Sequence, residues 1–156
     1  MPERIAKKIY TKILESNHIL LIPHQHPDGD ALGSVTALMH ILKRLGKRHS
    51  AFCATESSDK LLFLPHAKRL TTNTDVWTSD IDLIIVLDSG DLRYAGVDSH
   101  IKDMPKRPFI INIDHHPTNE HFGDLNLVIP EASSTTQILY HFFKVNAIDI
   151  DNYVAT

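Results

Sequence analysis

The stretch HILLIPHQHPDGDALGS, residues 18–34, decides the fold, because it joins an apolar strand to a polar loop and then to a helix. Its first six residues are rich in Ile and Leu and indicate a short buried strand. From near Ala31, leucines and a valine recur every three or four residues, which predicts a helix that Gly46 caps at its carboxyl end. Strand, polar loop and helix in this order form the repeating unit of parallel α/β sheets.

The same unit recurs along the rest of the chain. Ile5, Ile9 and Ile13 share one face of an opening helix, and Ser133 or Ser134 is expected to cap a last one. A short helix is predicted over residues 57–64. Further strands are predicted over residues 49–54, 82–87, 108–113 and 126–129. Apolar strands that alternate with helices indicate an α/β fold with a doubly wound, mainly parallel sheet and helices on both faces.

Composition limits the kinds of partner that the chain can bind. The 156 residues fit one domain, and a net charge of −3 argues against a basic platform for long duplex nucleic acid. A small phosphorylated substrate is compatible with this charge, because bound cations reverse its sign locally. The single cysteine, Cys53, excludes an internal disulfide, and no apolar run is long enough for a membrane span. We therefore expect a cytoplasmic protein without a membrane partner.

Three clusters of Asp and His each follow directly on a predicted strand. They occupy residues 24–30, 88–91 and 114–116. Taken singly, an Asp that closes a strand is more often a turn former or a helix cap than a functional residue. However, parallel strands end at the same edge of a sheet, where ligands bind in folds of this kind. We therefore expect the three clusters to meet at one functional site.

The residue types in these clusters favour divalent metal ions. Closely packed carboxylates repel one another unless a cation lies between them. A mixed Asp and His set without thiolates favours manganese over Mg, Co, Fe or Zn. Two ions about 3.5–4 Å apart, bridged by one carboxylate, commonly activate water for attack on phosphorus. A neighbouring histidine can then protonate the leaving oxygen or bind the phosphate.

Four motifs together resemble the DHH phosphoesterase superfamily. They are HQHPDGDALGS at 24–34, VLDSGD at 86–91, DHHPTN at 114–119 and EASSTTQILY at 131–140. The resemblance covers nearly the whole chain and implies a Rossmann-like DHH domain. Within the superfamily, the first motif is most similar to the nanoRNase and pAp-phosphatase group, and RecJ exonucleases are more distant members.

The resemblance also implies roles for individual residues. His24 and Asp28 are expected to bind one metal, Asp30 and His115 the second, and Asp88 to bridge the two. In the same family pattern, His116 contacts the scissile phosphate and Asp114 orients the motif. Arg93 matches an arginine with a role toward substrate in the nanoRNase group, although a solvated surface charge explains it equally well. His26 falls where the family pattern varies and is read as a non-ligand.

The implied reaction is metal-dependent hydrolysis of phosphate esters in short oligonucleotides or in 3′-phosphoadenosine 5′-phosphate. Two Mn2+ ions are the expected cofactors, with Mg2+ or Co2+ as substitutes. Two alternatives stay open: an inorganic pyrophosphatase, and a non-catalytic module that binds metal or nucleotide. The sequence also leaves open whether the chain forms a homodimer.

One departure from the family pattern concerns the carboxyl-terminal side of the chain. The family carries a further aspartate in a fourth motif, followed by a second domain that grips the substrate. Residues 1–156 contain neither. We therefore expect the DHH domain of this chain to be truncated before the fourth motif. One metal would then lack a ligand, so the chain alone is expected to be weakly active or inactive.

Overall fold

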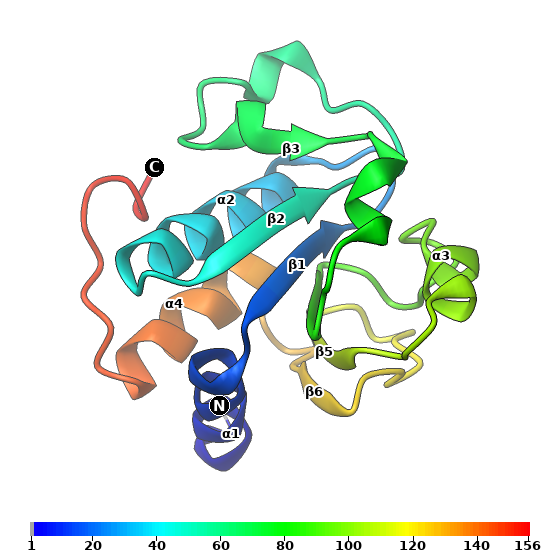
Figure 1. Cartoon of the computed structure of the whole chain (residues 1–156). Coiled ribbons are helices and arrows are strands. Elements are labelled where there is room, and N and C mark those ends of the chain that lie inside the picture. Colours follow the sequence, from blue (N-terminus) through cyan, green and yellow to red (C-terminus); the bar gives the residue numbers. More distant parts are fainter. Residues whose placement is uncertain (1) are drawn as a thin grey trace.

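The computed structural model describes residues 2–156, whose centre is a six-stranded sheet (Figure 1). Its strands lie in the order β3-β2-β1-β4-β5-β6, and every neighbouring pair is parallel. The strands are β1 (His18–Pro23), β2 (Arg48–Phe52), β3 (Leu70–Thr71), β4 (Leu83–Leu87), β5 (Phe109–Asp114) and β6 (Leu125–Val128). The predicted α/β fold is confirmed, and the sheet is wholly rather than mainly parallel.

Helices cover the two faces of the sheet unequally. Three of them, α1 (Glu3–Glu15), α2 (Gly29–Arg44) and α4 (Thr135–Val145), pack with Ile19, Leu21 and Ile85 in one core. On the other face, α3 (Asp98–Asp103) and the 3₁₀ helix η3 (Thr74–Thr78) pack against Leu20 and Ile84. Alternate strand residues therefore enter different cores. This two-sided burial explains why the strands are apolar throughout.

Most predicted elements occur within a few residues of their expected bounds. The second helix begins at Gly29, two residues earlier than expected, because the Asp28 side chain accepts hydrogen bonds from the N–H groups of Asp30 and Ala31. The helix predicted over 57–64 is only a 3₁₀ turn, η1 (Asp59–Leu61), followed by a second one, η2 (Ala67–Arg69). The short elements β3, α3 and η3 had no detectable sequence pattern.

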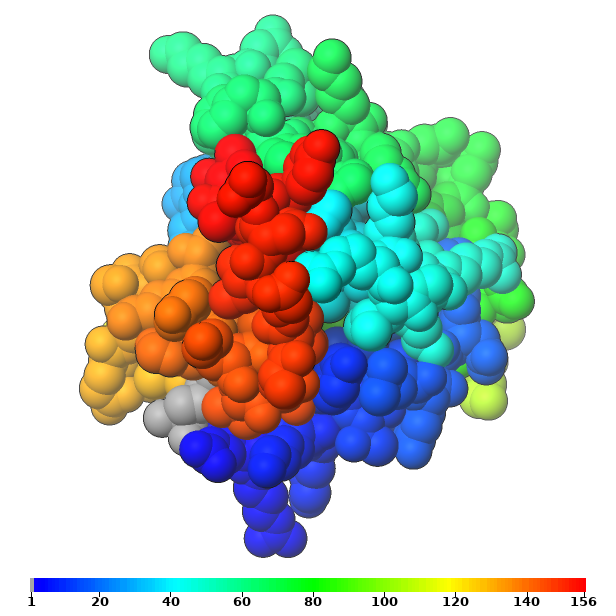
Figure 2. Space-filling model, turned by 90° about the vertical axis from the view of Figure 1, so that its left-hand side faces the viewer, coloured from blue at the N-terminus to red at the C-terminus, as the bar shows by residue number. Residues whose placement is uncertain are grey.

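The last residues run back across the helical face. After α4 the chain turns toward α2, and Figure 2 shows this segment in red on the surface beside the orange α4. Arg44 of α2 donates a hydrogen bond to the Asp149 carbonyl at 2.8 Å. His40, one turn earlier on α2, lies 2.9 Å from the Asp151 carboxylate. These contacts attach residues 149–151 to the outer side of α2.

Strand register places the three polar clusters level with one another. Pro23 pairs with Leu87, and Leu87 pairs with Ile113. Consequently His24, Asp88 and Asp114, which follow these residues, begin at the same carboxyl edge of the sheet. The expected convergence is confirmed. Among residues 2–156, no helix combines the length and the apolar character that crossing a bilayer requires.

Candidate metal centre

Asp88 occupies the centre of the polar edge. It follows β4 directly, is 2% exposed and has a left-handed backbone with φ of +58°. Its Oδ2 lies 3.6 Å from Nε2 of His24, and its Oδ1 lies 3.5 Å from Nε2 of His115. A left-handed conformation is uncommon for a residue other than glycine and persists only where surrounding contacts hold it. The carboxylate therefore faces two imidazoles from two other loops.

Two contacts hold Asp88 in this conformation. Its N–H donates to the Ile113 carbonyl at 3.0 Å, and the Thr135 hydroxyl donates to its Oδ1 at 2.7 Å. Thr135 begins α4, so this helix contributes directly to the polar edge. Sequence analysis did not single out Thr135, although it belongs to the serine-rich motif at 131–140.

The two imidazoles have matching orientations. Nδ1 of His24 lies 2.6 Å from the Gln25 carbonyl, and Nδ1 of His115 lies 3.3 Å from the Ala132 carbonyl. Since a carbonyl only accepts hydrogen bonds, each Nδ1 carries a proton, and in the neutral imidazole each Nε2 presents a lone pair to the carboxylates. Metal-binding histidines are oriented by such contacts. Both rings therefore present a ligand atom toward Asp88.

Asp28 and Asp30 approach from the start of α2. Oδ1 of Asp28 lies 3.9 Å from Nε2 of His24, and Oδ2 of Asp30 lies 3.7 Å from Nε2 of His115. The Asp30 carboxylate also accepts hydrogen bonds from the N–H groups of Thr135 and Thr136 at 2.7 and 2.9 Å. Asp30 thus joins the first turn of α2 to the first turn of α4 while it faces His115.

Two groups of three side chains at this edge have the spacing to hold a metal ion. One consists of His24, Asp28 and Asp88, and the other of Asp88, His115 and His116. Asp88 belongs to both groups, in the position expected of a bridging ligand. Asp30 stands outside the second group, although its Oδ2 lies 3.7 Å from Nε2 of His115. His26 lies in neither group and is exposed.

The donor chemistry of this edge fits divalent cations. The His–Asp distances of 3.5 to 3.9 Å exceed those of ordinary hydrogen bonds, so they leave room for an ion between the ligand atoms. Carboxylate oxygens and imidazole nitrogens, without a thiolate, suit ions such as manganese. The residues present therefore fit the expected metal cofactor.

The charges at this edge favour bound cations. Burial opposes an ionised Asp88, but its contacts with His24 and Thr135 outweigh burial and lower the pKa of this carboxyl. Burial likewise disfavours a protonated His24. The facing Asp88, the Gln25 carbonyl and Asp28 outweigh it and raise the pKa of the imidazole. A buried carboxylate that stays ionised needs positive charge nearby, which an ion would supply.

Asp114 and His116 form a separate pair beside the metal groups. Asp114 is fully buried at the end of β5, and its Oδ1 lies 2.7 Å from Nδ1 of His116. Its Oδ2 accepts a hydrogen bond from Asn119, which also donates to the Asn112 side chain. The contact with Asp114 leaves Nε2 of the partly exposed His116 free to meet a ligand. Asn112 and Asn119 were missed by sequence analysis, although Asn119 closes the third motif.

Arg93 lies outside the metal groups. Its guanidinium is exposed and lies 3.4 Å from the Glu120 carboxylate. Its backbone carbonyl accepts a hydrogen bond from Gln25, so the main chain at Arg93 is held against the first motif. The side chain shows no contact with a predicted metal ligand.

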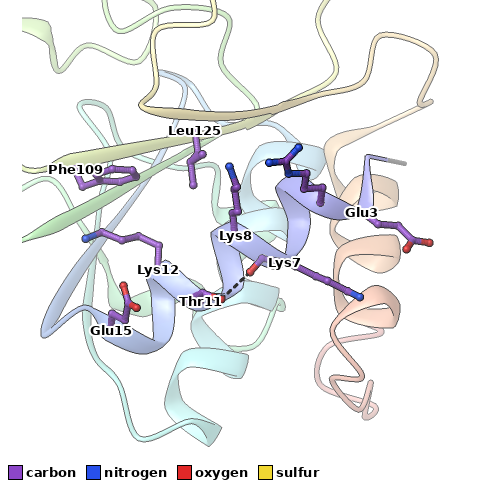
Figure 3. A pocket seen from close by; sticks show the side chains of 9 residues that line it. Glu3, Lys7, Lys8, Thr11, Lys12, Glu15, Phe109 and Leu125 are labelled. Atoms are coloured by element: carbon purple, nitrogen blue, oxygen red, sulfur yellow. Dashed lines mark hydrogen bonds between the residues drawn. The ribbon is translucent and has the colours of Figure 1, made fainter.

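A separate hollow of about 780 Å³ lies beside α1 (Figure 3). Basic side chains of α1, Lys8 and Lys12 among them, line it together with Phe109 and Leu125. Phe109 and Leu125 begin β5 and β6, so this hollow lies at the amino edge of the sheet. It is remote from the carboxyl edge and contributes nothing to the metal centre.

A family model agrees with this geometry. The model for the DHH family, N-terminal domain, matches residues 18–156. The chain belongs to the DHH family. The match includes the strands, loops and helix starts that build the polar edge, and it supports the resemblance found in the four sequence motifs.

Curated relatives include enzymes of more than one kind. A bifunctional oligoribonuclease and PAP phosphatase NrnA from Thermus thermophilus is 32% identical over 88% of this chain and 40% of its own length. A probable manganese-dependent inorganic pyrophosphatase from Enterococcus faecalis is 25% identical over 88% of this chain and 44% of its own length. The chain therefore spans less than half of either relative.

Solved structures share the fold. An exopolyphosphatase-related protein from Bacteroides fragilis has a TM-score of 0.87 at 25% identity and covers 97% of this chain and 47% of its own. RecJ from Thermus thermophilus, in complex with Mn2+, has a TM-score of 0.52 at 14% identity and covers 96% of this chain and 22% of its own. The RecJ similarity concerns the fold alone.

Proposed function

We propose that this chain supplies the metal-binding domain of a phosphoesterase that acts on short oligonucleotides or on 3′-phosphoadenosine 5′-phosphate. One observation carries the proposal: the buried carboxylate of Asp88 lies between the Nε2 atoms of His24 and His115. The NrnA relative supports the substrate class, because its name states both activities. The metal-ligand roles of His24, Asp28, Asp30, Asp88 and His115 are part of this proposal.

Two Mn2+ ions are the proposed cofactors, with Mg2+ or Co2+ as substitutes. His24, Asp28 and Asp88 would hold one ion, and Asp88 with His115 the other. Asp30, whose Oδ2 lies 3.7 Å from Nε2 of His115, would complete the second set. When bound, such ions activate water and neutralise charge on the phosphoryl oxygens.

The chain's own residues position the reacting groups. Asp88 stays ionised and keeps both imidazoles facing the same space. Asp114 accepts a hydrogen bond from Nδ1–H of His116 and thereby directs Nε2 of this ring outward. When Nε2 is protonated as well, His116 can donate a hydrogen bond from it to the phosphate or a proton to the leaving oxygen. Arg93, exposed nearby, can attract a phosphate further along the substrate.

Hydrolysis assays with the metal-loaded full-length gene product test this proposal. Dinucleotides and 3′-phosphoadenosine 5′-phosphate should be hydrolysed with Mn2+, and a chelator should stop the reaction. His116→Gln should reduce turnover of both substrates while it preserves metal stoichiometry, and His141→Gln, a change on the exposed side of α4, serves as its control. Metal binding without hydrolysis of any phosphate ester would favour the non-catalytic module instead.

An inorganic pyrophosphatase is the second candidate. The Enterococcus faecalis relative supports it and also carries manganese in its name. The ratio of turnover on pyrophosphate to turnover on 3′-phosphoadenosine 5′-phosphate separates the two functions, and a strong preference for pyrophosphate would refute the nucleotide proposal. A cytoplasmic location is likewise proposed. A measurement of mass in solution tests whether the chain forms a homodimer.

A further inference from the structure

Tyr94 covers one of the two imidazoles at the metal centre. Its ring stacks on His24 with the centroids 5.0 Å apart and the planes inclined by 25°. His24 is 5% exposed, whereas Tyr94 is 51% exposed. Half of the tyrosine surface is therefore open to solvent beside a ring that faces Asp88 and Asp28. An exposed aromatic side chain in this position is a surface for a second flat ring.

The main chain holds Tyr94 firmly against the first motif. Its N–H donates to the Asp91 carboxylate at 2.7 Å, and its carbonyl accepts hydrogen bonds from the backbone and the side chain of Gln25 at 3.2 and 3.3 Å. Gly96, at φ of +73°, passes so close to Gln25 that a Cβ atom would lie only 2.8 Å from its side chain. Because the main chain of this turn is already ordered, it loses little additional conformational entropy when a ligand stacks on Tyr94.

The surroundings of Tyr94 suggest what kind of ligand stacks there. Tyr153 stacks on His40 in almost the same geometry, with centroids 5.1 Å apart, so stacking on a histidine does not by itself indicate a ligand. Only Tyr94 lies beside carboxylates that would hold cations, and Arg93 adds an exposed positive charge next to it. A nucleotide matches this arrangement, because its phosphate is separated from its flat base by a single sugar.

We propose that Tyr94 is the platform on which the substrate base stacks, and that it makes the metal centre select nucleotides over base-free phosphates. This inference rests on the proposed function. Stacking of a base on an aromatic side chain is worth about 1–3 kcal/mol, which corresponds to about 5- to 140-fold in affinity. Tyr94 would therefore determine specificity, whereas the carboxylates and imidazoles would act on any phosphate ester.

A matched pair of substrates tests the proposal on the metal-loaded protein. Ribose 3′,5′-bisphosphate is 3′-phosphoadenosine 5′-phosphate without its base. Tyr94→Ala should lower the preference in kcat/KM for the adenine compound by about 5- to 140-fold, chiefly through KM. Tyr94→Phe should retain the preference, because the ring remains. Tyr153→Ala, which removes the other His-stacked tyrosine, should change neither value.

The outcomes separate the inference from the proposed function. If Tyr94→Ala lowers kcat/KM equally for both substrates and weakens Mn2+ binding in calorimetry, the ring only orients His24 and the inference is wrong. An unchanged preference would overturn it as well. If the unmodified full-length gene product hydrolyses no nucleotide, the proposed function itself fails before any variant is compared.

Discussion

Two clusters of histidine and aspartate in this molecule contrast in one respect. At the metal centre, His24 and His115 face Asp88 at 3.5 to 3.6 Å, and their Nδ1 atoms contact backbone carbonyls. In the outer cluster, formed by His40, His66 and Asp151, the His40 ring contacts Asp151 at 2.9 Å and His66 at 3.0 Å. We call the metal centre the open cluster. The outer cluster of His40, His66 and Asp151 is the closed cluster, because its side chains bond to one another.

The contrast shows why residue types alone do not define a metal site. In the outer cluster both ring nitrogens of His40 already have side-chain partners, so the ring presents no lone pair to an ion. At the metal centre, backbone carbonyls occupy Nδ1 and leave Nε2 unused. Satisfied polar groups stabilise a fold, whereas groups with unused lone pairs around a common space bind ligands.

Asp88→Asn should have the largest effect on the open cluster. The amide is neutral and cannot bridge two cations, so binding of at least one Mn2+ ion should weaken by more than about 100-fold while the fold persists. Calorimetry gives the stoichiometry, and circular dichroism checks the fold. Asp151→Asn, the matched change in the closed cluster, should leave the stoichiometry as it is. An unaltered stoichiometry in Asp88→Asn would contradict the bridging role.

Millimolar Mn2+ should stabilise the folded chain. An ion present at 100 times its dissociation constant adds about 2.7 kcal/mol, because it binds the folded state alone. For a domain of this size, that corresponds to a rise in Tm of about 5–10 °C. The shift should vanish in Asp88→Asn and persist in Asp151→Asn. If Tm does not change when manganese is added, the open cluster is not a metal site.

Asn119→Ala should loosen the pair beside the open cluster. The change removes the donor to the buried oxygens of Asp114 and Asn112, which costs about 1–3 kcal/mol in the free energy of unfolding. Turnover should fall too, because Asp114 then orients His116 less firmly. Urea titrations and assays measure both effects. Asn126→Ala, which removes the hydrogen bonds between this β6 side chain and Gly123, should affect stability alone.

Acidification should destabilise the fold at the closed cluster. This is the smallest of the expected effects. Burial lowers the pKa of His66 below its usual 6.5, and the nearby His40, Arg69, Lys43 and His49 lower it further. The unfolded chain therefore binds this proton more readily than the folded chain, so His66 destabilises the fold as pH falls below 6.5. Asp151, whose pKa His40 lowers, contributes stability that is lost only at more acidic pH.

The variant His66→Asn tests the pH effect. Asn tolerates the left-handed backbone at this position, where φ is +68°, and does not titrate. Thermal melts between pH 7 and 5 should show a shallower loss of Tm in the variant, by an amount that corresponds to less than one proton. If Tm falls with pH equally in the variant and the unmodified chain, His66 does not cause the pH effect.

Much of the fold could be predicted from local patterns. Apolar strand patterns, helical spacing and cap residues located the strands β1, β2, β4, β5 and β6 and the helices α1, α2 and α4, because these signals act over a few residues. The two-residue β3 and the six-residue α3 escaped detection, since neither is long enough for a periodic pattern. The helix expected over 57–64 is a 3₁₀ turn that places Leu64 in a small core with Leu32 and Ala67.

The sequence by itself determined which residues stand at the carboxyl edge, because parallel strands of matched register end together and each polar cluster follows its strand directly. Only the tertiary structure decided how these residues face one another. Three contacts join segments far apart in the chain. Asp88 lies 3.5 Å from His115, Thr135 donates a hydrogen bond to Asp88, and Tyr94 stacks on His24. Such distances follow from the packing of whole helices and loops, which no local pattern encodes.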